Sequence, residues 1–202
     1  MRASNFTSTA AALAVFTLVA STAFAESPDP RFTTVDPVVV GNASGNALGG
    51  LSPGFDVVVR DVSNNPVPGQ IVTLDFWPTA LRLSSVQSAG TTLNCAAKKI
   101  SRVTDANGAV KFAARFGGYT NVDAIYVDES GIELGSVKAR STDIDGLDGK
   151  TGLGDFALFS NNFLGNTAAQ ETDFDLNGLT GLADFSLFVN EFLSGATAPY
   201  CP

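Results

Sequence analysis

The chain has 202 residues, a formal net charge of −8 and no histidine. Without histidine it lacks the commonest general base and the usual zinc ligand, which excludes serine triads and His-Glu zinc motifs. Its negative charge makes nucleic acid and anionic membrane surfaces poor partners. We therefore expect neither a hydrolase of these classes nor a nucleic-acid-binding protein.

The N-terminus has the features of a secretory signal. Arg2 precedes an apolar stretch at 10–20, and the small-residue triplet Ala23-Phe24-Ala25 predicts cleavage before Glu26. We assign 1–25 to a signal peptide and expect a protein that is secreted or held at the cell surface. The stretch is too short to cross a bilayer, and no other segment is long and apolar enough, so we expect no membrane span.

Residues 26–141 alternate between β-rich runs and turn clusters. The clusters include Ser63-Asn64-Asn65-Pro66 and Asp105-Ala106-Asn107-Gly108, whose residue types favour turns. Seven runs have the composition of short strands: 35–40, 55–60, 71–76, 100–104, 109–116, 122–127 and 132–139. Seven short strands in this length predict an all-β Ig-like sandwich.

The same region carries a family resemblance. The stretches at 57–61, 65–74 and 104–110 read Val-Val-Val-Arg-Asp, Asn-Pro-Val-Pro-Gly-Gln-Ile-Val-Thr-Leu and Thr-Asp-Ala-Asn-Gly-Ala-Val. They resemble the bacterial Ig-like domains of invasin-type surface proteins. That resemblance implies a spacer or an adhesive stalk, although a fold alone does not settle a function.

The β-rich region offers little that predicts catalysis. A glycosidase needs two carboxylates across a cleft, and Asp75 or Asp123 could pair with Asp128 or Glu129. Sequence spacing gives no reason to choose them over ordinary solvated acids of strand edges and turns. We expect no enzyme activity in this chain.

Trp77 is the one tryptophan. On an exposed surface its ring could stack on a sugar, with help from Tyr119 and Tyr126, which would make the region a glycan-binding module with a polysaccharide partner. The alternative is a ring buried in the core beside a strand end, which is the simpler explanation.

Two similar acidic segments follow, 29 residues apart. The second, 173–184, places side-chain oxygens at positions 1, 3, 5 and 12, a glycine at 6 and a backbone carbonyl at 7, which is the pattern of a calcium loop. Its predicted ligands are Asp173, Asp175, Asn177, Leu179 and Asp184. The first segment, 143–155, has one extra residue, which we assign to Gly146, and its predicted ligands are Asp143, Asp145, Asp148, Lys150 and Asp155. We expect two Ca²⁺ ions, and the second loop follows the pattern more closely.

Each loop leads into a short helix with phenylalanines at i, i+3 and i+7, so that two apolar stripes can bury each other. The duplicated loop and helix, aspartate at position 12 (Asp155, Asp184) and the Leu-Ala-Asp-Phe run at 182–185 resemble a type I dockerin. The resemblance implies a cohesin-like partner, in a polysaccharide-degrading or cell-surface assembly. Positions 10 and 11 of the loops and the exposed sides of the helices are the candidate partner contacts: Leu153, Gly154, Leu182, Ala183, Ser160, Asn161, Val189 and Asn190.

These observations divide the chain into a signal peptide (1–25), an Ig-like sandwich (26–141), a small α-helical dockerin-like pair (142–195) and a tail (196–202). Cys95 and Cys201 either form a disulfide that ties the tail to the middle domain, or remain a buried thiol and a free one. The leading functional prediction is a secreted, non-catalytic calcium-binding protein that docks onto a cohesin-like partner. The alternatives are an adhesin or structural protein in which calcium serves only as a staple, and the glycan-binding module.

Overall fold

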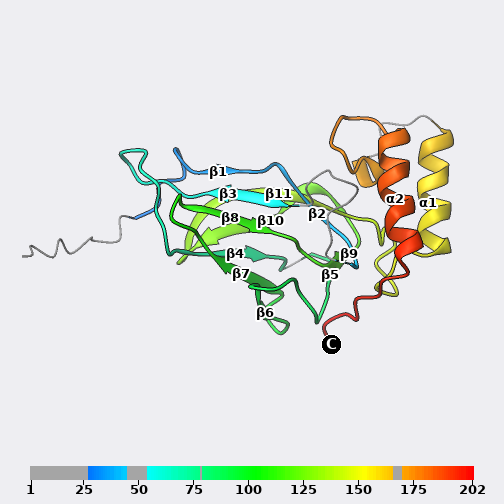
Figure 1. Ribbon diagram of the computed structural model, residues 1–202, viewed down its shortest axis with the longest axis horizontal. Coiled ribbons are helices and arrows are strands. Elements are labelled where there is room, and N and C mark those ends of the chain that lie inside the picture. The colour runs from blue at the N-terminus through cyan, green and yellow to red at the C-terminus, as the bar shows by residue number, and fades with distance from the viewer. Residues whose placement is uncertain (1–26, 45–53, 78, 166–169) are drawn as a thin grey trace, which may run out of the picture.

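The structure is a computed structural model that describes residues 27–44, 54–77, 79–165 and 170–202. The predicted signal peptide lies outside the described residues. Within the described part, the strands all lie between Thr34 and Ser141, and two α-helices follow. Figure 1 shows the helices side by side at one end of the molecule, with the C-terminal tail returning beneath the strands.

Most of the strands join one curled sheet of six (Figure 1). Its order is β2 (Val38–Gly41), β11 (Ile132–Ser141), β10 (Thr120–Glu129), β4 (Ile71–Asp75), β7 (Lys99–Val103) and β6 (Thr92–Asn94). The β2–β11 pair is parallel and the other pairs are antiparallel. The β10–β11 hairpin closes through Ser130 and Gly131, both at positive φ, which suits a tight two-residue connection.

Two smaller sheets complete the β region. The first has the order β1 (Thr34–Val35), β3 (Phe55–Val58) and β8 (Ala109–Phe112), and the second pairs β5 (Arg82–Leu83) with β9 (Phe116–Gly117). The run predicted at 35–40 supplies both β1 and β2, because Pro37 has no N–H to donate to a ladder and divides the run between two sheets. Strands β5 and β6 fall outside the predicted runs.

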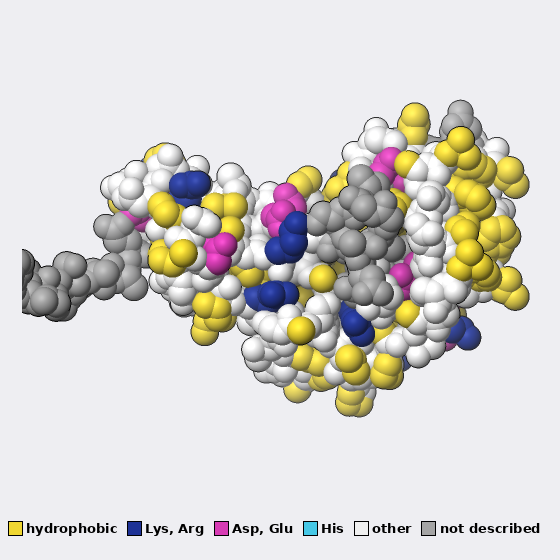
Figure 2. Space-filling model, viewed as in Figure 1, with side chains coloured by type: hydrophobic (Ala, Val, Ile, Leu, Met, Phe, Trp, Pro, Cys, Tyr) yellow, Lys and Arg dark blue, Asp and Glu magenta, His cyan; other side chains and the backbone are white. Residues whose placement is uncertain are grey.

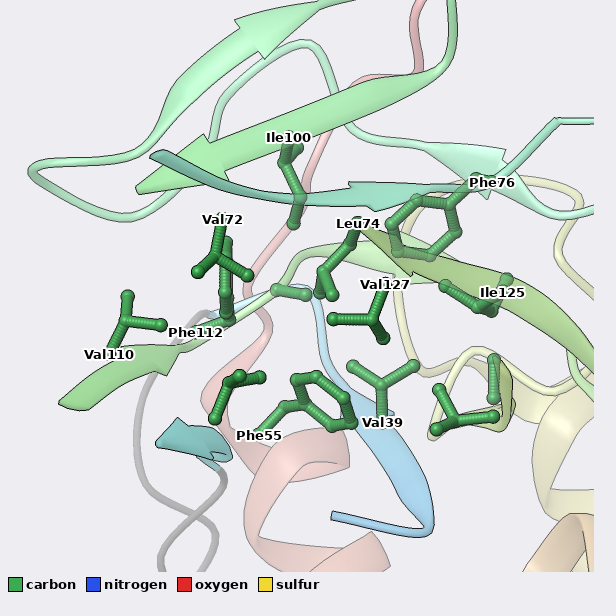
Figure 3. Close-up of a cluster of buried hydrophobic side chains, with 14 of the residues drawn as sticks. Val39, Phe55, Val72, Leu74, Phe76, Ile100, Val110, Phe112, Ile125 and Val127 are labelled. Carbon is green, nitrogen blue, oxygen red and sulfur yellow. The ribbon is translucent and has the colours of Figure 1, made fainter. Parts of the chain in front are cut away.

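One hydrophobic core lies between the six-stranded and three-stranded sheets (Figure 3). Phe55 and Phe112 come from the smaller sheet and Leu74, Ile100 and Val127 from the larger one, and all are almost fully buried. Their burial follows the alternation of each strand, since successive side chains point to opposite faces. This core fixes the position of β11, whose C-terminal end leads directly into the first acidic loop.

A second, smaller core lies between α1 (Leu153–Leu164) and α2 (Leu182–Ser194). Phe159 and Phe188 are fully buried with ring centroids 4.9 Å apart, as the two phenylalanine stripes predicted. Val40 on β2 packs against this core, and a 3₁₀ turn, η1 (Gln170–Thr172), precedes the second loop. The helices therefore rest on the edge of the sheet.

The expected fold class, an all-β Ig-like sandwich followed by a small α-helical dockerin-like pair, is wrong. The described chain is mostly β-sheet around one curled six-stranded sheet, with only two short α-helices. Alternation in the sequence identifies the buried face of a strand but not its neighbours. Here the long β10–β11 hairpin gathers β4, β7 and β6 on one side and a parallel β2 on the other.

Candidate metal centre

The last aspartate of each acidic loop is held at the start of a helix. Asp155 and Asp184 are the third residues of α1 and α2, and each accepts a 2.8 Å hydrogen bond from the N–H of the N-cap glycine, Gly152 or Gly181. A helix N-terminus favours negative charge, so the carboxylate is stabilised there although it is buried. The two copies are built alike.

Each helix start gathers two further aspartates from its loop. The first group is Asp143, Asp145 and Asp155, which we call site one, and the second is Asp173, Asp175 and Asp184, which we call site two. In each group one carboxylate oxygen per residue lies within 4.8 Å of the others. Both groups could hold a metal ion, and oxygen ligands of this kind suit hard cations.

The backbone turns within each loop explain how its aspartates converge. Gly149 and Gly178, 29 residues apart, have φ of +75° and +94°, a conformation that glycine adopts without steric cost. Three residues after the first aspartate, Gly146 and Leu176 have φ of +64° and +63°. Gly146 therefore corresponds to Leu176. The extra residue of the first loop is the exposed Leu147, and the assignment of the extra residue to Gly146 was wrong.

One predicted carboxylate ligand, Asp148, lies outside the two groups. Asp148 is half exposed and pairs with Lys150 at 3.4 Å, so site one gathers three of the four predicted carboxylates. Asn177 is exposed and donates from its amide to Asp175 at 2.7 Å, while Leu179 is also exposed. Lys150 and Leu179, predicted to offer carbonyls, occupy equivalent places in the two loops.

Crowding and burial alter the acidity of these groups. Burial, opposed by the Tyr200 hydrogen bond and reinforced by the charges of Asp155 and Asp145, raises the pKa of Asp143 to about 7. Burial also raises the pKa of Asp155 and of Asp184. The anionic forms are thus costly here, and a bound cation would offset that cost. The donor set and its charge fit a divalent metal ion.

The first aspartate of each site is held by one donor from outside its loop, and the sequence predicted neither donor. The Tyr200 hydroxyl donates to Asp143 Oδ2. The Arg140 guanidinium, on β11, pairs with Asp173 Oδ2 at 3.0 Å and donates to the Asp173 carbonyl. No local sequence motif predicts the contact of Arg140 with Asp173. Tyr200 could have been noticed as the neighbour of Cys201.

The tail that carries Tyr200 is anchored to the β region. Cys95 and Cys201 form a disulfide, which settles the alternative that the sequence left open. Arg82 lies 4.4 Å from the Tyr200 ring centroid, and a Cβ on Gly117 would overlap the Tyr200 hydroxyl. Ala198 donates its N–H to the Gly149 carbonyl at 2.7 Å, so the tail also contacts the first loop directly.

The predicted partner contacts lie along the outer side of the helices. Figure 2 shows hydrophobic side chains gathered at the end of the molecule where α1 and α2 lie. Leu153 and Leu182 are 77 % and 76 % exposed, and Phe156, Leu158 and Phe185 are partly exposed. Of the remaining candidates Gly154, Asn161, Ala183 and Asn190 are exposed, and Ser160 and Val189 are half-buried.

Trp77 is 59 % exposed, so the simpler expectation of a buried ring is wrong. Lys98 Nζ lies 5.8 Å from the centroid of the Trp77 ring, and the backbone N–H of Trp77 donates to Asp75 Oδ1 at 2.9 Å. Tyr126 is also exposed and is the ladder partner of Asp75, two residues from Trp77. Trp77 lies at the surface just past the end of β4, whereas Leu74 and Phe76 before it are fully buried in the core.

Within the described ranges, none of the helices is long and apolar enough to cross a bilayer. No protein-family model, curated protein or solved structure matches this chain.

Proposed function

We propose that this chain is an exported calcium-binding protein whose two loop-helix repeats each hold one Ca²⁺ and together present a docking face to a partner protein. The observation that carries the proposal is the recurrence of three converging carboxylates at equivalent places in two repeats. Ca²⁺ accepts several oxygen ligands in flexible geometry, whereas Mg²⁺ demands near-ideal octahedral geometry. The chain has no histidine, and both cysteines are in a disulfide, so softer metals find no preferred ligands.

Calorimetric titration of Ca²⁺ into chelator-stripped mature protein tests the metal part. We expect two ions per chain and a gain in helical circular dichroism, because folding of the repeats is coupled to charge neutralisation. Asp145→Ala and Asp175→Ala form a matched pair, since each removes one equivalent ligand that caps no helix. Each should bind one ion. Absence of calcium binding by the unsubstituted protein would refute the proposal.

The docking part rests on the exposed apolar side chains of α1 and α2. Contiguous exposed apolar surface on a soluble protein commonly marks an interaction site. Because the loop and helix motif resembles that of type I dockerins, we propose a cohesin-like domain as the partner. A purified cohesin-like domain should bind the calcium-loaded protein, and Leu153→Asp with Leu182→Asp should abolish that binding. Calcium binding without any such docking would favour the adhesin or structural alternative.

Exposure of Trp77 favours a second candidate function, glycan binding by the β region. A broad ring at the surface, with Tyr126 nearby on the same sheet, can stack on a sugar ring and offers polar groups at its edge. Affinity electrophoresis on insoluble and soluble polysaccharides tests this function. Retardation lost in Trp77→Ala and kept in Val122→Ala, another exposed apolar position, would support it. A protein that no polysaccharide retards would exclude it.

A further inference from the structure

The two sites differ in the charge of the donor that holds their first aspartate. At site one the donor is the Tyr200 hydroxyl, which is neutral. At site two it is the Arg140 guanidinium, whose side chain is 7 % exposed and whose partner Asp173 is 6 % exposed. The two aspartates play the same role in their loops, so the difference in charge comes from the β region and the tail, not from the repeats.

This difference changes the formal charge that an ion would meet. Three carboxylates surround each site, and at site two one guanidinium in direct contact reduces their formal charge to minus two. The cavity of about 360 Å³ beside Arg140 and Asp173 is also lined by Lys138 and Asp123, whose charges oppose each other. Lys138 Nζ donates a 3.0 Å hydrogen bond to Gln170 Oε1. Arg140 is therefore the charged group outside the loop that contacts a predicted ligand of site two.

We propose that Arg140 is a specificity-determining residue that matches site two to divalent ions and disfavours trivalent ones; this inference rests on the proposed function. A buried guanidinium repels a bound cation in proportion to the charge of that cation. The penalty is therefore larger for a trivalent ion than for Ca²⁺, although both accept the same oxygen ligands. Burial of the pair keeps this repulsion from being screened by salt.

The test compares the affinities of La³⁺ and Ca²⁺ by calorimetry in an Asp145→Ala background, where site two is the site that remains intact. Arg140→Met removes the charge and retains an apolar stem, and we expect the La³⁺/Ca²⁺ affinity ratio to rise at least about tenfold. Arg140→Lys is the matched control, because it keeps the charge but not the planar fork. Its ratio should stay within about twofold of the parent value.

The La³⁺/Ca²⁺ affinity ratio distinguishes an effect of the Arg140 charge from an effect of Arg140 on the position of Asp173. If Arg140 only orients Asp173, Arg140→Met weakens the binding of both ions alike and the La³⁺/Ca²⁺ affinity ratio does not change. That result would overturn the inference while leaving the calcium-binding function in place. If the parent protein binds neither ion, the proposed function fails as well.

A second measurement does not depend on whether Arg140→Met folds. Asp175→Ala leaves site one, where the donor is the neutral Tyr200, and Asp145→Ala leaves site two. We expect the La³⁺/Ca²⁺ ratio to be higher at site one. Equal ratios, or a higher ratio at site two, would contradict the role of Arg140.

Discussion

Glu191 on helix α2 is joined to Ser44, which follows strand β2, by two hydrogen bonds of 2.7 Å. The Ser44 N–H donates to Glu191 Oε1 and its hydroxyl donates to Oε2. The two residues are 147 positions apart, and the Glu191 side chain is 4 % exposed. This contact fastens the second repeat to the sheet.

Substitution of Glu191 should therefore loosen the helices from the sheet. Glu191→Ala loses both hydrogen bonds to a charged acceptor, and we expect the free energy of unfolding to fall by about 1.5–3 kcal/mol. Denaturant unfolding with calcium in excess would measure it. Glu191→Gln, which keeps one acceptor oxygen, should lose less. The neighbouring exposed Asn190→Ala should change stability by less than about 0.5 kcal/mol, and an equal loss in all three variants would argue against the contact.

The disulfide should support site one more than site two. Replacing Cys95 and Cys201 together by alanine opens a long loop, and we expect a loss of about 2–5 kcal/mol in unfolding free energy. The same change frees the tail that carries Tyr200, so calcium affinity should fall at site one and stay nearly constant at site two. Titration of the single-site variants Asp175→Ala and Asp145→Ala, each with and without the disulfide, checks this asymmetry. Tyr200→Phe isolates the contribution of the hydroxyl.

Leu176 is a bulky residue at positive φ, a conformation in which its Cβ crowds the backbone. Leu176→Gly should remove that strain and raise the unfolding free energy by up to about 1 kcal/mol, net of the backbone entropy of glycine. Leu147→Gly is the matched control, because Leu147 is the residue 29 positions earlier, is exposed and is not among the positive-φ residues. Thermal unfolding of the metal-free proteins should show opposite shifts, and a loss of stability in Leu176→Gly would count against the strain.

The pKa of Asp143 predicts a pH dependence of the metal-free protein. Because the folded-state pKa is raised to about 7, the folded state binds the proton more tightly than the unfolded state. The stabilisation is present at low pH, below the unfolded value of about 3.9, and is lost as pH rises towards 7. In chelator, denaturant midpoints should fall between pH 4 and pH 7, and Asp143→Asn should flatten this decline.

Calcium should reverse this trend, since the ion binds the deprotonated carboxylates and releases their protons. Midpoints measured in excess calcium should therefore rise over the same range of pH. A decline that is identical with and without calcium would exclude Asp143 from the metal site.

The sequence alone was sufficient to predict the local features of the two repeats. Spacing identified the acidic loops, and the period of the phenylalanines predicted that Phe159 and Phe188 would pack. Each of the seven predicted runs also carries a strand, because alternation reflects which face of a strand is buried, whereas the short strands β5 and β6 were missed. These features depend on residues close together in the chain.

Only the tertiary structure decided how these pieces combine. The six-stranded sheet, the exclusion of Asp148 from site one and the exposure of Trp77 depend on which segments become neighbours, and a local pattern does not specify that. The same holds for Arg140 and Tyr200, which reach Asp173 and Asp143 from 33 and 57 positions away. Long-range pairing is selected by the packing energy of the whole core, so the groups that complete the sites could be found only in the folded chain.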